Sequence, residues 1–309
     1  DVDLDGSFTG EADLIRFDRG AFRPVGSGEL ALVGARLARY RIREDGPKLQ
    51  IEFTPEPLPK RARGPLLHAL LMLNHWRNGV ALAPKLLDLG ASRACQLHVD
   101  YWARNGYSGH DEDPSMPGYT QEGHDAGLAS TCSPGGAPST VIQWVTATIL
   151  HRQTALGTAD RGLGIGLGQG CCILGGRPAV SGRRHPLVVP AAGQTGVPLI
   201  LQKESPDSDR VPDLYDAPRG YPVSVTLGRD IHQMENVSLR LYEFGKEPKE
   251  VPGFEFTPEK PYSSSLSKNG SSAHFVARQP LARRTIYLAS FGADRAGAPI
   301  EFAWYFRTR

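Results

Sequence analysis

The spacing of apolar side chains changes sharply along this chain, and that change constrains the fold more than any other feature. Helical spacing occurs in three segments, Pro65–Gly79, Ala91–Asn105 and Ser139–Gln153. From residue 185 to the end, the apolar runs are short and turn residues separate them. The 309 residues include 35 glycines and 25 prolines, which favours short elements joined by many turns. We therefore expect an α+β protein in which an all-β module follows a helical one.

The segment 185–309 has the pattern of a β-sandwich of immunoglobulin-like (Ig-like) size. Its expected strands are Pro186–Pro190, Val197–Leu201, Tyr221–Leu227, Val237–Phe244, His274–Ala277, Thr285–Phe291 and Ile300–Arg307. No cysteine lies in this segment, so the inter-sheet disulfide of antibody domains is absent. We predict an Ig-like β-sandwich domain over 185–309.

Residues 1–63 are expected to form an N-terminal extension. Residues 1–28 show no clear periodicity, and we expect them to be extended or irregular. Apolar residues then alternate on both sides of the turn dipeptide Asp45-Gly46, which predicts a β-hairpin. Prolines between residues 55 and 59 end the second strand and form a stiff linker.

Glycines alternate with apolar residues from Gly162 to Gly170. Neither the G-x-G-x-x-G frame nor the G-x-x-x-x-G-K-[ST] frame of a phosphate loop fits this stretch. A glycine in a strand often marks a close approach of another backbone. We therefore predict a tightly packed strand rather than a phosphate-binding loop.

The four cysteines, Cys95, Cys132, Cys171 and Cys172, show no C-x-x-C spacing, which argues against a zinc ribbon or a thioredoxin-like motif. Adjacent cysteines pair with each other only through a strained ring, so Cys171 and Cys172 would instead bridge to Cys95 and Cys132. Two disulfides and four reduced thiols both remain open.

Residues 106–139, between the second and third expected helices, are rich in glycine, proline, serine and aspartate, and such loops often carry function. The candidate cleft residues are His110, Glu112, Glu122, His124 and Asp125, together with His151 at the end of the third helix. Neutral imidazoles suit zinc, which makes His110, His124 and His151 the candidate metal ligands. Glu112 or Glu122 would provide an oxygen ligand, or a general base for a metal-bound water. The alternative is that these histidines only hydrogen-bond across the loop, as we expect for His98 in its packing role.

Charge and hydropathy exclude two classes of partner. The formal net charge is +2, and the basic run Lys60–Arg63 is too short for a nucleic-acid surface. No apolar run approaches the ~18 residues that a membrane-spanning helix needs. We therefore expect that the protein has no nucleic-acid partner and is not an integral membrane protein.

The residues Leu73–Gly79 and Ala94–Tyr101, followed by Trp144, His151-Arg152 and Gly164–Gly168, resemble the motifs of CAP proteins. This is the superfamily of cysteine-rich secretory, antigen 5 and pathogenesis-related proteins, also called SCP-like. The resemblance covers roughly residues 65–173. It implies a CAP α-β-α sandwich over 64–184, and the tail resembles the Ig-like domain that accompanies bacterial CAP modules.

The cleft of the family usually holds two histidines and two glutamates. The resemblance places His110 and His151 at the histidine positions. Gly123-His124-Asp125 stands where the family has Gly-Glu-Asn, so a histidine replaces the first glutamate. The second glutamate has no counterpart, because Ser139–Leu150 contains no acidic residue.

The resemblance implies an extracellular, cell-surface or periplasmic location. The chain begins at Asp1 without a signal peptide, and we expect a mature product or a fragment. We expect a binding module with a histidine-lined cleft rather than an enzyme, whose ligand is a protein, a lipid or a cell-wall component. Two alternatives stay open: a metal-dependent hydrolase of peptide or cell-wall substrates, and a structural surface protein attached through the Ig-like domain.

Overall fold

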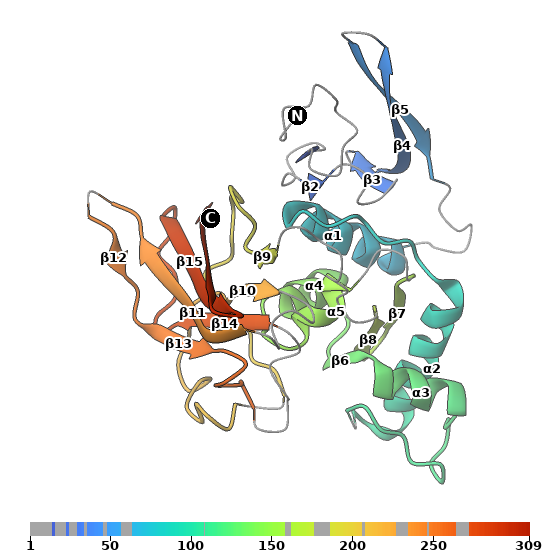
Figure 1. Cartoon of the computed structure of the whole chain (residues 1–309). Helices are drawn as coiled ribbons and strands as arrows, with labels where there is room; N and C mark the ends of the chain where they lie inside the picture. The colour runs from blue at the N-terminus through green and yellow to red at the C-terminus, as the bar shows by residue number, and fades with distance from the viewer. Residues whose placement is uncertain are drawn as a thin grey trace. The chain divides into compact units, whose positions relative to one another are not determined.

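We describe a computed structural model of the chain (Figure 1). It describes residues 14–15, 23–24, 30–33, 36–45, 48–56, 64–107, 109–157, 162–175, 186–205, 208–226, 234–245, 247–263 and 272–309. The chain divides into two compact units. Unit 1 comprises Asp1–Val145 and Thr154–Arg177, and unit 2 comprises Thr146–Gln153 and Pro178–Arg309. The sequence predicts a module over 64–184 that includes Thr146–Gln153, whereas the structure groups this segment with the C-terminal strands.

The helices and the N-terminal strands lie in the first part of the chain. They are β1 (Leu14–Ile15), β2 (Arg23–Pro24), β3 (Leu30–Val33), β4 (Arg36–Asp45), β5 (Lys48–Pro55), α1 (Pro65–Gly79), α2 (Leu89–Asn105), α3 (Gln121–Ala129), β6 (Thr131–Pro134), α4 (Pro138–Thr146), α5 (Arg152–Leu156), β7 (Gly164–Leu167) and β8 (Gly170–Leu174). This mixture confirms the α+β class.

The first two expected helices are confirmed as α1 and α2. Pro65 begins α1, where a missing N–H costs nothing. The side chain of Asp88 caps α2 by accepting from Ala91 N at 3.0 Å. Leu70 and Leu73 of α1 are buried in an apolar cluster, which explains the helical spacing of the sequence.

The prediction of one continuous third helix over Ser139–Gln153 is wrong. The structure has α4, then an irregular turn, then the short α5. In the turn, the backbone N–H groups of Ile149, Leu150 and His151 donate to the carboxylate of Glu204. These donors would bond to the preceding helical turn if the helix continued. The helix is interrupted where a residue about fifty positions away takes its donors.

Helix α3 lies within the segment expected to be a loop. Thr120 caps it by accepting from Gly123 N at 3.0 Å. Its two internal glycines disfavour a helix by propensity, but both are packing positions. A Cβ on Gly127 would stand 2.4 Å from the His98 ring, and one on Gly123 would stand 2.8 Å from Thr120 Oγ1.

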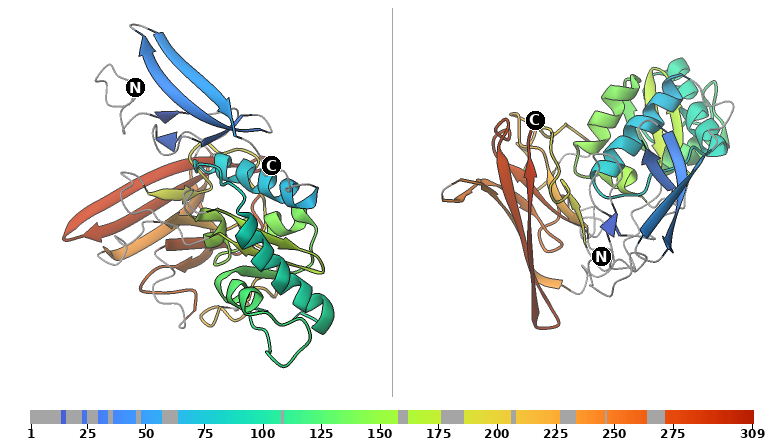
Figure 2. Two further views of the ribbon diagram at one scale, coloured as in Figure 1. Left: turned by 90° about the vertical axis from the view of Figure 1, so that its right-hand side faces the viewer. Right: turned by 90° about the horizontal axis from the view of Figure 1, so that it is seen from above.

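The glycine-rich strand is confirmed as a packing device. Strand β7 belongs to the antiparallel sheet β6-β8-β7, and α2 packs against β7 and β8. A Cβ on Gly164 would lie 2.7 Å from the Cβ of Ala91, and one on Gly166 would lie 2.4 Å from the backbone of Cys95. Only glycine lets the helix backbone come this close to the strand (Figure 2).

The expected N-terminal hairpin is confirmed by β4 and β5, which pair antiparallel with Tyr40 opposite Phe53 and Ile42 opposite Ile51. Strand β3 pairs with β4 on its other side. Residue Gly46 of the predicted turn lies outside the described residues, as do Lys60–Arg63 and most of 1–28.

Unit 2 contains two antiparallel sheets in a sandwich-like arrangement. Its strands are β9 (Leu187–Val189), β10 (Val223–Thr226), β11 (Met234–Glu243), β12 (Lys249–Glu250), β13 (Gly253–Phe256), β14 (Ser272–Ala277), β15 (Ile286–Arg295) and β16 (Ala298–Arg307). One sheet has the order β13-β14-β10-β9 and the other has the order β12-β11-β15-β16. Strand β11 contacts β13 and β14 of the facing sheet.

Most strands predicted for unit 2 are confirmed, and the differences are local. Val197–Leu201 is not a strand, because its residues make only isolated bridges, Val197 to Thr308 and Ile200 to Gly220. The sequence misses β12 and β13, which are short and flank Pro252. Within the described residues, no helix is long and apolar enough to span a bilayer.

Candidate functional site

The predicted cleft residues of unit 1 surround a buried histidine–glutamate pair between α2 and the loop that follows it. His98 Nδ1 lies 2.6 Å from Glu112 Oε1, and both side chains are fully buried. His98 Nε2 donates to the carbonyl oxygen of Gly109 at 3.0 Å. Both ring nitrogens are therefore satisfied, which confirms the packing role expected for His98. Glu112 lies too deep to reach a substrate.

The other candidate residues of this loop lie nearer to the surface. His110 is exposed, and its Nδ1 donates to the Gly127 carbonyl at 2.9 Å. His124 is half-buried, with its Nδ1 3.4 Å from Asp111 Oδ1. Glu122 forms an exposed ion pair with Arg93 at 3.4 Å, and Asp125 accepts from Gln121 Nε2 at 2.7 Å. The contacts of His110 and His124 join α3 to the preceding loop, whereas the Glu122–Arg93 pair joins α3 to α2.

The predicted metal ligands do not form one group in the described structure. His110 and His124 belong to unit 1, whereas His151 belongs to unit 2. Across the residues that the structure describes, no group of three or more histidine, cysteine, aspartate or glutamate side chains is placed to hold a metal ion.

In unit 2, His151 pairs with a glutamate that the sequence analysis missed. Its Nδ1 lies 2.8 Å from Glu204 Oε2, and the Glu204 side chain is fully buried. The same carboxylate accepts from Ile149 N at 2.6 Å, from Leu150 N at 2.9 Å and from His151 N at 3.1 Å. No local pattern predicts this contact, because Glu204 is distant in sequence. Its negative charge stabilises the turn before α5.

The neighbouring Arg152 is fully buried, and its guanidinium joins two backbone segments by hydrogen bonds. Its Nε donates to the Thr146 carbonyl at 2.9 Å, and its Nη1 donates to the Pro222 carbonyl at 2.7 Å. Its guanidinium carbon lies 4.7 Å from the centre of the Tyr221 ring. Burial lowers the pKa of Arg152 from its usual value. The predicted His151-Arg152 motif thus holds the Thr146–Gln153 segment onto unit 2.

Beside Arg152, a polar cluster covers one face of strands β10 and β14. Ser224 stands opposite His274, and Thr226 stands opposite Ser272, so all four share one face. Thr226 Oγ1 lies 2.8 Å from Ser272 Oγ. His274 is fully buried, and neither ring nitrogen has a hydrogen-bond partner among the described residues. Burial and the charge of Arg152 lower the pKa of His274 to about 3, so this ring is neutral.

The cysteines form no disulfide in this structure. Cys95, Cys132 and Cys172 share one buried cluster, and Cys171 lies in a different one. Burial raises the pKa of Cys171, and contact with neighbouring thiols together with burial raises those of Cys95 and Cys172. Thiols held in this way are poor nucleophiles.

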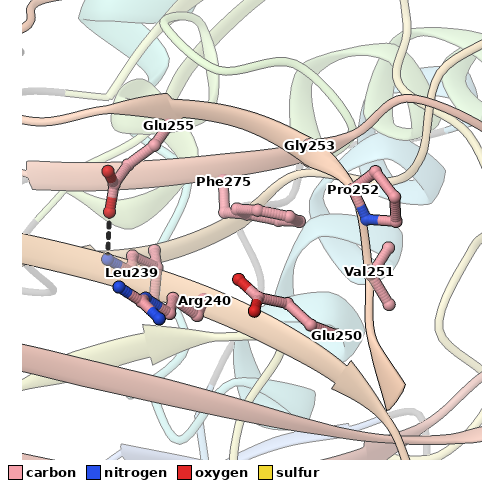
Figure 3. A pocket seen from close by; sticks show the side chains of 8 residues that line it. All are labelled: Leu239, Arg240, Glu250, Val251, Pro252, Gly253, Glu255 and Phe275. Carbon is pink, nitrogen blue, oxygen red and sulfur yellow. Dashed lines mark hydrogen bonds between the residues drawn. The ribbon is translucent and has the colours of Figure 1, made fainter.

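Each unit has a hollow on its described surface. The α2 groove of unit 1 has a volume of about 640 Å³ and is mostly apolar. Its lining residues are Pro65, Leu66, Leu89, Ser92, Arg93, Gln96, Gly136, Pro138, Ile165, Leu167 and Gly168. The hollow of unit 2 has a volume of about 530 Å³ and lies between β11 and the connection from β12 to β13 (Figure 3). There Glu255 points across and accepts from Leu239 N, and Phe275 forms part of the wall.

Comparisons with known proteins add little to this geometry. No protein-family profile matches the sequence, and no curated protein is similar to it. Among solved structures, PcoC, a copper resistance protein from Escherichia coli, is similar with 14% identity and a TM-score of 0.25. The match covers 40% of this chain and 95% of that one. A TM-score this low supports no inference about fold or function.

Proposed function

We propose that this protein is a CAP-type binding protein of the extracellular, cell-surface or periplasmic space, with an Ig-like second domain. The order of elements in unit 1 supports the CAP assignment. The N-x-x-R segment lies in α1, the next motif in α2, and the closing glycine strand packs directly under α2. Asn74 and Arg77 of that segment are buried and bond to neighbouring backbone carbonyls, which gives the motif a structural role.

One observation favours binding over hydrolysis: three of the groups suited to acid–base chemistry, His98, Glu112 and Glu204, are buried and bonded inside the protein. His98 and Glu112 are fully buried, and so is the Glu204 side chain that holds His151. A general base must come within hydrogen-bond reach of its substrate. These three buried groups stabilise the fold, and they are out of reach of a substrate.

The α2 groove is the surface best suited to a ligand, and we propose that it takes an amphipathic lipid with an anionic head. Leu66, Leu89 and Leu167 provide an apolar wall, and the volume of about 640 Å³ is in the range of small-molecule sites. Among the residues that line the groove, Arg93 has the positively charged side chain. Its ion pair with Glu122 is exposed and therefore weak, so the guanidinium can also meet a carboxylate.

A fluorescence titration of the full chain with a long-chain fluorescent fatty acid tests this proposal. Leu89→Asp places a negative charge in the groove, while the first position of α2 tolerates an acidic residue well. We expect saturable binding by the unaltered protein and binding weakened about tenfold or more in this variant. Leu128→Asp is the matched control, because Leu128 is 57% exposed and does not line the groove.

Absence of saturable binding, or equal loss in both variants, would contradict the lipid proposal. The same preparation tests the metal alternative by zinc titration of His110→Ala and His124→Ala. Stoichiometric zinc that both substitutions remove would support a metal-dependent role instead.

A further inference from the structure

We infer that Cys132 and Cys172 are the residues of one cross-strand disulfide, which forms when the chain folds under oxidising conditions. The two cysteines are direct partners in the antiparallel pair of β6 and β8. The inference does not depend on the proposed ligand of the α2 groove. A single bridge differs from both alternatives that the sequence leaves open, two disulfides and four reduced thiols.

The backbone register alone brings these two residues within bridging range. Directly opposed residues of antiparallel strands have Cα atoms about 4.5 or about 5.5 Å apart, according to the type of pair. Disulfides accept Cα separations of about 4.4 to 6.8 Å. Opposed residues also place their side chains on the same face of the sheet. The pairing of Cys132 with Cys172 therefore meets the Cα spacing that a disulfide needs.

The strand alternation excludes Cys171 from this bridge. Cys171 stands opposite Ser133 and Leu167, and its side chain lies in the cluster of Leu70 and Leu73. Cys172 lies on the other face, in the cluster of Val99 and Trp102. A bridge from Cys171 to Cys132 would require one strand to turn over. Cys171 therefore stays a buried thiol.

Cys95 is the competing partner, since its thiol also hydrogen-bonds with Cys172. Its position is set by helix packing: the backbone of Cys95 lies against Gly166, which is the β7 partner of Cys172. A bridge from Cys95 would tie α2 to the sheet at the tightest helix–strand contact. The β6–β8 ladder instead fixes the Cys132–Cys172 spacing, because the pairs on either side, Thr131 with Ile173 and Ser133 with Cys171, hold the register. We assign the bridge to this ladder.

The reaction is a double exchange with a small disulfide such as oxidised glutathione. The Cys172 thiolate attacks one sulfur of the reagent, forms a mixed disulfide and releases one glutathione thiol. The Cys132 thiolate then attacks Cys172 Sγ and releases the second glutathione. Two protein thiols are oxidised, one reagent disulfide is reduced, and the two protein protons end on the two glutathiones. Because the thiols are buried in the folded chain, the exchange takes place during folding.

The test is to unfold and reduce the full chain, refold it in a glutathione redox buffer, alkylate the free thiols in denaturant and map the peptides without reduction. We expect one cross-linked peptide pair, Cys132 with Cys172, and alkylated Cys95 and Cys171. The bridged protein should unfold at a higher urea concentration than the reduced protein. Cys171→Ala should keep the cross-link, and Cys132→Ala should abolish it.

Two results would overturn the assignment. One is a refolded protein in which all four cysteines are alkylated. The other is a cross-link from Cys172 to Cys95 or from any partner to Cys171. Far-ultraviolet circular dichroism of each variant separates loss of the bridge from loss of the fold.

Discussion

At the scale of single residues, Glu204 stabilises the turn between α4 and α5 by binding its backbone N–H groups. Its buried carboxylate accepts three consecutive backbone N–H groups and contacts the His151 ring. A carboxylate bound by several N–H groups is a strong local anchor. The residue that ends a helix can thus lie far from that helix in sequence.

Glu204→Gln should destabilise unit 2 strongly. The amide keeps the shape but places an NH₂ group where backbone donors now find an acceptor. We expect the free energy of unfolding to fall by about 3 kcal/mol. Urea denaturation measures this change, and the exposed Glu259→Gln is the control, expected to change stability by less than about 0.5 kcal/mol. Equal stability of the two variants would show that the anchor is unimportant.

His274 should make the stability of the protein pH-dependent. Its folded pKa of about 3 lies below the usual value of 6.5, so the unfolded chain binds the proton more readily between these pH values. The contribution is fully present above pH 6.5 and is lost as the pH falls toward 3. From pH 7 to pH 5, the free energy of unfolding should fall by about 2 kcal/mol more than in His274→Leu.

Urea denaturation of both proteins at pH 7 and pH 5 measures this difference, because every other titrating group is common to them. Parallel pH dependence would mean that the His274 ring has the same pKa in the folded and unfolded chain, which would contradict a pKa lowered by burial beside Arg152.

At the scale of elements, the sequence predicts what local spacing controls and misses what distant contacts control. Helices α1 and α2 follow from apolar spacing and end signals, and the hairpin β4–β5 follows from alternation. Helix α3 is missed because its glycines look like breaks, although they are needed for contact with His98 and Thr120. The break after α4 depends on Glu204, which no window of the sequence includes.

Local spacing also locates part of the candidate site. The sequence places His110, Glu112 and His124 on one loop and identifies His98 as a packing residue. It cannot show that Glu112 turns inward to His98, because burial is a property of the folded loop. Two partners of Arg152, Pro222 and Ser224, are about seventy residues away in sequence, so its role is visible only in the structure.

The contact of α2 with β7 should tolerate no side chain at Gly166. An added Cβ would lie 2.4 Å from the Cys95 backbone, and the helix would have to move. We expect Gly166→Ala to lower the free energy of unfolding by about 3 kcal/mol. Gly245→Ala is the control, because the nearest atom to its Cβ lies at 3.7 Å. Thermal unfolding of both variants measures the effect, and a stable Gly166→Ala protein would contradict the close packing.

At the scale of the whole molecule, the chain crosses between its two units more than once. Thr146–Gln153 belongs to unit 2, while the segments before and after it belong to unit 1. Ile149 is fully buried in a cluster with Leu201, Leu214 and Phe256. The segment that carries His151 and Arg152 therefore contributes Ile149 to the core of the C-terminal unit. The groove proposed for ligand binding lies entirely within unit 1.

The most direct test of the proposed function is photo-crosslinking of the full chain with a fatty acid that carries a diazirine on its acyl chain, followed by peptide mapping. We expect saturable labelling at residues that line the α2 groove, and a large reduction of that labelling in Leu89→Asp. The labelled residues should be among Pro65, Leu66, Leu89, Ser92, Arg93, Gln96, Gly136, Pro138, Ile165, Leu167 and Gly168. Labelling confined to other surfaces, such as the hollow near Phe275, or labelling that never saturates, would contradict this expectation.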